Sequence, residues 1–312
     1  MKLYLLIITA SFLGCSSVKN SEAQEGSQLL KDLEILSSDT YEGRKTETEG
    51  AEMARAYIHD RFKQIGLSAV DGTQSYEQPF SFKNGKGKTV NGTNMIAKVS
   101  GKSDNLIVIS AHYDHIGIIN NEIYNGADDN ASGVAVLLKL AEYFKNNKPS
   151  HTIIFAAFDA EEMGLQGARY FVSKPLLPLN NIKLNINMDM VSRSDKDELY
   201  ACGTYKYPQL KPYIKTGNTK IKVLAGHDDP KTGHDDWTNQ SDHAAFNDKD
   251  IPFIYFGVED HKDYHKETDE FKNITTEFFK NAAGAIQEIA VRLDRQLYIK
   301  SLINEKKIMN RQ

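Results

Sequence analysis

Two short apolar runs, each followed at once by acidic residues, constrain the fold of this chain more than any other feature. They occupy residues 153–158, followed by DAEE, and residues 184–188, followed by Asp189. Short runs of this kind, rich in β-branched and aromatic residues, are typical of buried strands in a largely parallel sheet. In open α/β sheets, ligands and catalysis gather beyond the carboxyl ends of the strands. We therefore expect Glu161, Glu162 and Asp189 to lie at one functional edge of a sheet.

The rest of the chain alternates between strand and helix patterns. Short strands are expected within 76–100, most clearly at 94–99, and further strands at 106–111, 199–201 and 253–258. Helices are expected at 29–36, 51–65, 132–144, 168–172, 241–246 and 278–303. This alternation predicts an α/β fold, a three-layer α/β/α sandwich with a mostly parallel, mixed central sheet. With 40% hydrophobic residues among 312, the chain is large enough for one such domain, which we place at 27–300, with a charged C-terminal tail at 301–312.

The N-terminus has the pattern of a targeting segment. Lys2 precedes an apolar run over residues 3–13, which has the length of a signal-peptide core, and Cys15 follows. Residues 1–15 resemble a bacterial lipoprotein signal, in which the cysteine is lipidated, and 16–26 would be a polar tether. This implies an extracytoplasmic protein anchored to a bacterial membrane. The alternative is an ordinary secretory peptide. The net charge of −4, without a long basic run, argues against nucleic acid as a partner.

Three further motifs carry histidines or acids next to predicted elements. In AHYDHIG, His112 and Asp114 are two residues apart and share one side of an extended chain, whereas His115 faces the other way. In GADDNASG, Asp128 precedes a predicted helix, where either metal binding or simple helix capping would explain it. In DYHKETD, His265 follows the last predicted strand. A carboxylate, from Asp114 or another nearby acid, is expected to hold the second nitrogen of a metal-binding histidine.

These motifs supply enough donors for a metal centre. The candidate ligands are His112, Asp128, Glu162, Asp189 and His265. Two histidines and three carboxylates suit zinc, and one shared acid would make a two-metal site with the ions roughly 3.5–4 Å apart. Glu161 is then free to act as a base.

In this order and spacing, six motifs resemble those of the co-catalytic zinc aminopeptidases, the family of secreted bacterial leucyl aminopeptidases. They are AHYDHIG, GADDNASG, FDAEEMGLQGA, NMDM, SDHAAF and DYHKETD, and the resemblance covers about residues 29–289. It implies a zinc exopeptidase fold and two Zn²⁺, one held by His112 and Asp189, the other by Glu162 and His265, with Asp128 bridging. It also implies that Asp114 orients His112, that Glu161 is the general base and acid, and that the Tyr264 phenol stabilises the oxyanion. A cis peptide between Asp128 and Asp129 is implied as well.

Other polar residues near these motifs are expected to be structural. Ser241 in SDHAAF is expected to cap a helix, and Arg193 to pair with an internal acid. Arg44, in the loop at 43–50, has no assignment from the resemblance. Four histidines outside the motifs are expected at the surface: His151, His227, His234 and His261.

The sequence thus predicts a lipid-anchored zinc aminopeptidase that acts on peptides with a free N-terminus. One alternative is a glutaminyl cyclase, a one-zinc transferase of the same fold, in which Trp stands before the last histidine and the GADDNASG loop is lacking; here Tyr264 stands there. A dipeptidase or carboxypeptidase of the same clan would share the zinc site. A metal-free binding lipoprotein is the alternative from another class.

Overall fold

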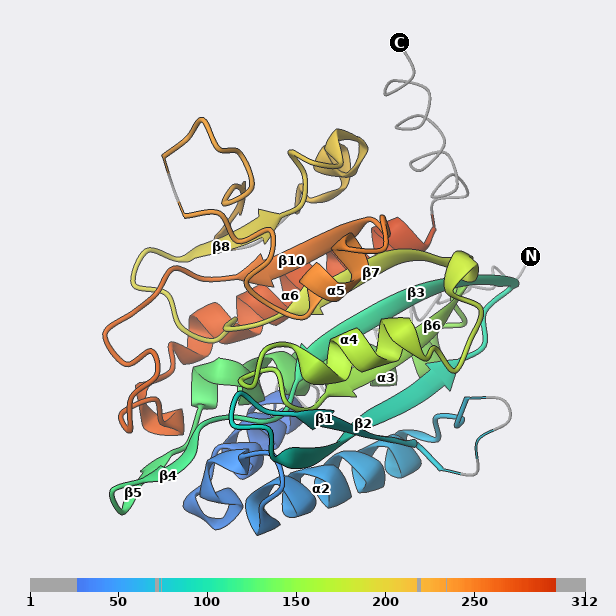
Figure 1. The fold of residues 1–312 in the computed structure, drawn as a ribbon. Coiled ribbons are helices and arrows are strands. Elements are labelled where there is room, and N and C mark those ends of the chain that lie inside the picture. The colour runs from blue at the N-terminus through green and yellow to red at the C-terminus, as the bar shows by residue number, and fades with distance from the viewer. Residues whose placement is uncertain (1–26, 71–72, 74, 218–219, 234, 296–312) are drawn as a thin grey trace, which may run out of the picture.

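A twisted sheet of eight strands crosses the middle of the molecule (Figure 1). The structure, a computed structural model, describes residues 27–70, 73, 75–217, 220–233 and 235–295. The strand order is β1-β2-β6-β3-β7-β10-β8-β9. The strands are β1 (Glu77–Lys83), β2 (Thr89–Val99), β3 (Ser103–His112), β6 (His151–Phe158), β7 (Ile182–Met188), β8 (Glu198–Cys202), β9 (Lys222–Ala225) and β10 (Phe253–Gly257).

The centre of the sheet is parallel and its flanks are mixed. Strand β3 pairs in parallel with β6 and β7, and β10 pairs in parallel with β7. The hairpin β1–β2 joins β6 antiparallel, and β8 joins β10 antiparallel while pairing in parallel with β9. Four neighbouring strands therefore end at the same edge, which brings the motifs after β3, β6, β7 and β10 together.

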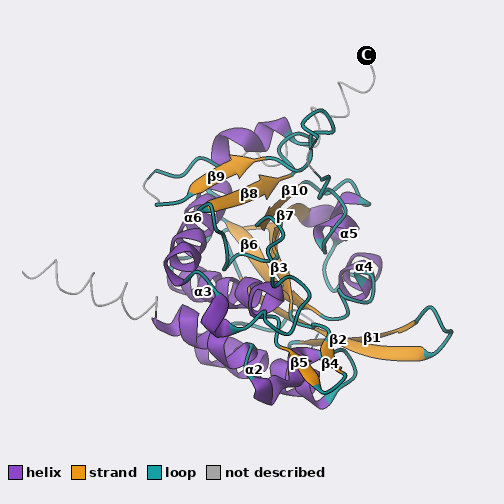
Figure 2. Cartoon of the chain, turned by 90° about the vertical axis from the view of Figure 1, so that its left-hand side faces the viewer, coloured by secondary structure: helices purple, strands orange, loops and turns teal. Residues whose placement is uncertain are grey.

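Helices cover both faces of the sheet, as Figure 2 shows. One face carries the helix at 27–36, α2 (Glu49–Ile65), α3 (Gly133–Asn146) and α6 (Thr276–Asp294), and the other carries α4 (Gln166–Ser173) and α5 (His243–Asn247). Side chains of β3 alternate between the two cores: Ile107 and Ile109 pack with α3, while Leu106 and Val108 pack with α4 and α5. This alternation follows from the period of two in a strand that is buried on both faces.

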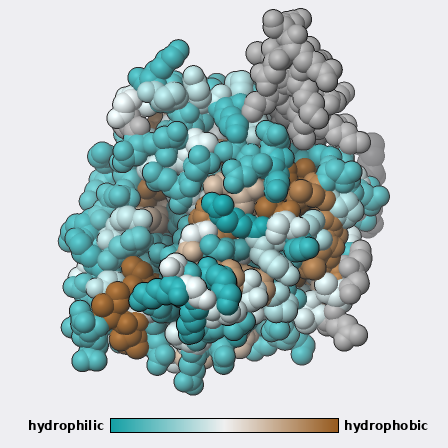
Figure 3. All heavy atoms as spheres, viewed as in Figure 1, coloured by the Kyte–Doolittle hydropathy of each residue, from teal (hydrophilic) through white to brown (hydrophobic). Residues whose placement is uncertain are grey.

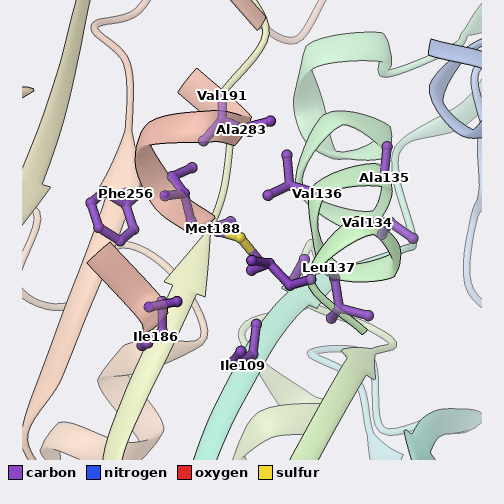
Figure 4. Close-up of a cluster of buried hydrophobic side chains, with 14 of the residues drawn as sticks. Ile109, Val134, Ala135, Val136, Leu137, Ile186, Met188, Val191, Phe256 and Ala283 are labelled. Carbon is purple, nitrogen blue, oxygen red and sulfur yellow. The ribbon is translucent and has the colours of Figure 1, made fainter. Parts of the chain in front are cut away.

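The larger core lies between β3, β7 and the pair α3 and α6 (Figure 4). In that view Met188 from β7 points toward Val136 and Leu137 of α3, and all three are fully buried. Met188 immediately precedes Asp189, so packing of the strand end also fixes the position of the Asp189 backbone. Adjacent residues of the sequence therefore build the core and the functional edge.

The three-layer fold and the mostly parallel, mixed sheet are confirmed. The predicted helix at 278–303 is observed as α6, which ends at Asp294, and residues 296–312 lie outside the described part of the chain. Strand β9 and a small hairpin, β4 (Gly117–Ile119) and β5 (Glu122–Tyr124), were not predicted. The hairpin exposes Ile118 and Ile119, and Figure 3 shows a hydrophobic patch at the lower left, where Figure 1 has β4 and β5.

The predicted signal at 1–15, Cys15 and the tether at 16–26 also lie outside the described residues. Among the helices of the described residues, none has the length and apolar character needed to cross a bilayer.

Candidate metal centre

His112 ends β3 inside a buried cluster with two acids. Its Nε2 lies 3.2 Å from Oδ1 of Asp189 and 3.4 Å from Oδ1 of Asp129. Its Nδ1 lies 3.1 Å from the carbonyl oxygen of Asp114, a contact that places the ring proton on Nδ1. Nε2, on the other side of the ring, faces the two carboxylates and is the atom that a metal ion would use. We call these three side chains the inner cluster.

A second cluster lies on the other side of Asp129. The Nε2 of His265 lies 3.1 Å from Oδ2 of Asp129 and 3.7 Å from Oε2 of Glu162. His115 joins the same acids, with its Nδ1 2.8 Å from Oε1 of Glu162 and 3.7 Å from Oδ2 of Asp129. We call these four side chains the outer cluster. Asp129 thus offers one oxygen to each cluster.

The prediction put Asp128 between His112 and His265, but the structure has Asp129 there. The Oδ1 of Asp128 accepts hydrogen bonds from the backbone N–H and the hydroxyl of Ser192, at 2.6 Å and 2.8 Å. Its Oδ2 lies 3.0 Å from Nε2 of His261. Asp128 therefore faces the scaffold behind the loop and belongs to neither cluster. The cis peptide is likewise found between Asp129 and Asn130, not between Asp128 and Asp129.

Asp269, the last residue of DYHKETD, holds the loop that carries these two aspartates. Its carboxylate accepts the backbone N–H of Asp128 at 2.9 Å and that of Asp129 at 3.0 Å. Burial, with the nearby charge of Asp128, raises the pKa of Asp269 to about 6. On the helix side, the side chain of Asn130 accepts the N–H of Gly133 at 2.9 Å and so caps α3. The loop is thereby fixed from both ends.

Glu161 sits in the turn after β6, and Asp114 shapes that turn. The carboxylate of Asp114 accepts the backbone N–H of Glu161 at 3.0 Å and of Glu162 at 3.3 Å. Asp114 does lie beside His112, but the contact with the ring is made by its carbonyl, while Oδ1 stands 3.7 Å from Nδ1. Burial raises the pKa of Glu161 well above its usual range, and the charge of Asp189 adds to the effect although His112 opposes it.

A pocket of about 320 Å³ opens beside both clusters. The Tyr264 ring lines it and stacks on His265 with 3.9 Å between ring centroids. Burial raises the pKa of this phenol, so its proton stays on the oxygen at neutral pH. The lining also includes Asp129, Glu161, Glu162, Asp189 and Asp260 on the acidic side, and Leu165, Met190, Trp237, Tyr255 and Val258 on the apolar side.

The SDHAAF motif packs behind the site, as expected, but not through a serine cap. The helix α5 begins at His243, and Ser241 instead accepts a hydrogen bond from the Asn187 side chain at 3.0 Å. Asp242 is fully buried, and neither of its oxygens has a hydrogen-bond partner among the described residues. Burial raises the pKa of Asp242 to about 7. This acid lies in the field of His112 and Asp189.

The two arginines near the motifs have structural roles. Arg44 is fully buried and donates to four backbone carbonyls, those of Leu36, Tyr113, Asn125 and Gly126. It therefore ties the loop before Asp128 to the loop after His112. Arg193 pairs with the buried carboxylate of Asp263, which confirms the predicted internal partner.

The expected surface histidines are largely internal. His151 is buried and contacts Asp294, and His227 is buried and stacks on Trp237 with 3.5 Å between centroids. His261 contacts Asp128, as described above. The prediction of surface positions was therefore wrong for these three, and His234 lies outside the described residues.

The residues present fit metal ions. The groups His112, Asp129, Asp189 and His115, Asp129, Glu162 each bring three ligand atoms within 4.8 Å of one another. Burial alone would raise the pKa of Asp129, but the three surrounding histidines outweigh it and hold that pKa well below its usual range. Several carboxylates facing one another in a buried pocket need cationic compensation, and mixed nitrogen and oxygen donors suit zinc.

This fold, with such a site at the carboxyl edge of its sheet, defines an α/β metallopeptidase. The model of "Peptidase family M28" matches residues 94–290, more than half of the sequence. The chain belongs to peptidase family M28.

Similar curated proteins include several with peptidase names. The alkaline phosphatase isozyme conversion protein of Escherichia coli is 29% identical over 181 residues, which are 54% of this chain and 52% of that protein. Aminopeptidase YwaD of Bacillus subtilis is 32% identical over 143 residues, 44% of this chain and 30% of that protein. A probable zinc metalloprotease of Pyrenophora tritici-repentis is 31% identical over 160 residues, 48% and 32% of the two chains. The matches span about half or less of these relatives.

Solved structures share the fold at low identity. LapB of Legionella pneumophila superposes with a TM-score of 0.68 at 18% identity, covering 92% of this chain and 77% of that one. A leucine aminopeptidase precursor of Bacteroides thetaiotaomicron gives 0.68 at 17% identity, covering 85% and 96%. At such identities the likeness extends to the fold alone.

Proposed function

We propose that this protein is a two-zinc aminopeptidase that removes N-terminal residues from peptides. The observation that carries the proposal is Asp129, which offers one carboxylate oxygen to each of two histidine-containing clusters. Zinc bound there would polarise the scissile carbonyl and make water a nucleophile at neutral pH. The inner ion would be held by His112, Asp129 and Asp189, and the outer one by Asp129, Glu162 and His265.

Glu161 is the proposed general base and acid. It lines the pocket but is not needed in either group of ligands. A carboxyl whose pKa is raised by burial can take a proton from water and pass it to the leaving amine. The Tyr264 phenol, which stacks on His265 and keeps its proton, would donate a hydrogen bond to the oxyanion.

The pocket lining supports a substrate with a free amino terminus. Its acidic side attracts an ammonium group, and its apolar side, with Met190, Trp237 and Val258, would receive an apolar side chain of the first residue. An N-blocked peptide lacks that charge and should bind poorly. A peptide that begins with Leu or Met is therefore the expected substrate type.

The test is a panel of peptides with free, acetylated and glutamine N-termini, assayed on the zinc-loaded protein by mass spectrometry. Release of the first residue from free peptides only, lost with a chelator and restored by zinc, supports the proposal. Release of the last residue would mean a carboxypeptidase, cleavage of dipeptides alone a dipeptidase, and cyclisation of N-terminal glutamine a glutaminyl cyclase. Any of these three results would replace the aminopeptidase assignment.

We propose in addition that Cys15 carries a lipid and holds the protein on the extracytoplasmic side of a bacterial membrane. The support is the apolar run at 3–13 followed by Leu-Gly-Cys in positions 13–15. In a bacterium that processes lipoproteins, Cys15→Ala should move the expressed protein out of the membrane fraction or block removal of the signal. An unchanged distribution, with no lipid on the mature N-terminus, would contradict the anchor.

A further inference from the structure

The outer cluster contains one more imidazole than the proposed pair of ions requires. His115 faces Glu162 and Asp129 with its Nδ1, and its ring centroid lies 6.1 Å from that of His265. The chain was expected to turn His115 away, because alternation along a strand would put it opposite His112. However, β3 ends at His112, so the alternation stops there.

The His115 ring is held in this direction by its surroundings. The residue is 1% exposed, and its backbone N–H points to the carbonyl of Arg44. A Cβ at Gly126 would stand 2.5 Å from Cδ2 of this ring, so the glycine lets the ring pack directly on the backbone. Its Nε2 is buried without a hydrogen-bond partner among the described residues. Within the described part of the chain, the polar contacts of this ring that the structure records are those of Nδ1 with the two acids.

Each histidine of the outer cluster lies at a ligand-to-ligand distance from both acids. Ligand atoms about 2.0–2.1 Å from a zinc ion stand about 3.3 Å from one another in a tetrahedron. The distances from His115 Nδ1 and His265 Nε2 to the oxygens of Asp129 and Glu162 run from 2.8 to 3.7 Å and so bracket that value. The inner cluster offers three side chains, which leaves the fourth position of a tetrahedron open.

We propose that His115 is a fourth protein ligand of the outer metal position. With four protein ligands this position would have no open coordination site and would bind its ion more tightly. The open coordination site would then lie at the inner position. The proposal rests on the proposed two-zinc function. Closed four-ligand sites are typical of structural zinc, and three-ligand sites with an open position are typical of catalytic zinc. In this protein the outer ion would then act mainly to hold Asp129 and Glu162 in place.

The rival explanation is that His115 only donates a hydrogen bond from Nδ1 to Glu162, since 2.8 Å is also a hydrogen-bond length. Two variants separate these roles. His115→Asn puts an amide near the position of Nδ1, so it preserves a donor to Glu162 but is a poor zinc ligand. His115→Ala removes both. His151→Asn is the matched control, because His151 is a buried histidine that contacts Asp294 and belongs to neither cluster.

The experiment titrates metal-free protein with zinc against a chromophoric chelator, and records the absorption spectrum of the Co²⁺-loaded protein and the zinc X-ray absorption at one equivalent. We expect two binding steps in the wild type, with the tighter ion bound by two imidazoles. Both His115 variants should weaken the tighter step by at least about tenfold, lose one imidazole and change the cobalt bands, whereas His151→Asn changes none of these.

Wild-type affinity and imidazole count in His115→Asn would overturn the proposal and leave a hydrogen-bond role. The same holds if both variants weaken the two steps equally. If the wild type binds no zinc, the proposed function itself falls, which is a different result from two ions bound without His115.

Discussion

Two adjacent aspartates in the loop at 126–133 have the same side chain but different surroundings. Asp128 and Asp129 are adjacent and both buried, yet Asp129 faces three histidines while Asp128 faces Ser192 and His261. One carboxylate is therefore available to ions, and the other is used up by scaffold hydrogen bonds. The comparison teaches that residues which bind no ion, such as Asp128, are needed to hold the loop so that its neighbour faces the histidines.

The largest effect is expected from Asp129→Asn. This change removes the carboxylate that both clusters share, so zinc affinity should fall by at least about 100-fold. Loss of a residue that only hydrogen-bonds to a metal ligand typically lowers metal affinity by about 10–100-fold, and loss of a shared ligand should cost more. Peptidase activity should disappear with it. Zinc content after dialysis and peptide hydrolysis measure the result. If the variant keeps two ions, Asp129 is not the bridge.

Glu161→Gln should separate chemistry from metal binding on the pocket side. A positioned proton-transfer group contributes roughly 10²–10⁴-fold, so kcat should fall by that factor while zinc content stays unchanged. Stopped-time assays and metal analysis on the same preparation are sufficient. Near-wild-type kcat would mean that another group takes the proton.

The contribution of Asp269, which holds the loop from behind, can be tested through the pH dependence of stability. Because the pKa of Asp269 is raised to about 6 in the fold, from 3.8, the folded protein binds this proton more tightly than the unfolded chain. The free energy of unfolding of the metal-free protein should therefore fall as pH rises from about 4 to 6, by up to about 3 kcal/mol from this group, and level off above. Other buried acids such as Asp242 act in the same direction.

Asp269→Asn removes that contribution, so its unfolding free energy should lose less between pH 4 and 6 than the wild type does. Urea denaturation at a series of pH values gives both curves. Parallel curves for the two proteins would show that Asp269 is not the group responsible.

The smallest effect is expected from Asp128→Asn, the counterpart of Asp129→Asn. It weakens charged hydrogen bonds to Ser192 and His261 while keeping an acceptor oxygen, so the protein should lose about 1 kcal/mol of stability. Zinc content should remain at the wild-type value. A loss of zinc equal to that in Asp129→Asn would contradict the conclusion that only Asp129 of these two residues serves the metal centre.

Sequence patterns alone determined the architecture and the edge at which the site lies. The apolar runs at 153–158 and 184–188 are β6 and β7, and the acids and histidines that follow β3, β6, β7 and β10 meet beyond those strands. This succeeded because strand periodicity and the geometry of parallel sheets depend on local composition. The donor types also indicated zinc before any geometry was known.

Only the tertiary structure decided which neighbouring residue does what. Once a strand has ended, spacing no longer fixes direction, so the orientation of His115 and the choice between Asp128 and Asp129 depend on contacts from distant segments. Asp269 holds the backbone of one loop from 140 and 141 residues away, and Gly126 makes room for the His115 ring. Such long-range contacts leave no periodic pattern in the sequence, because they are set by packing and by the pairing of buried polar groups.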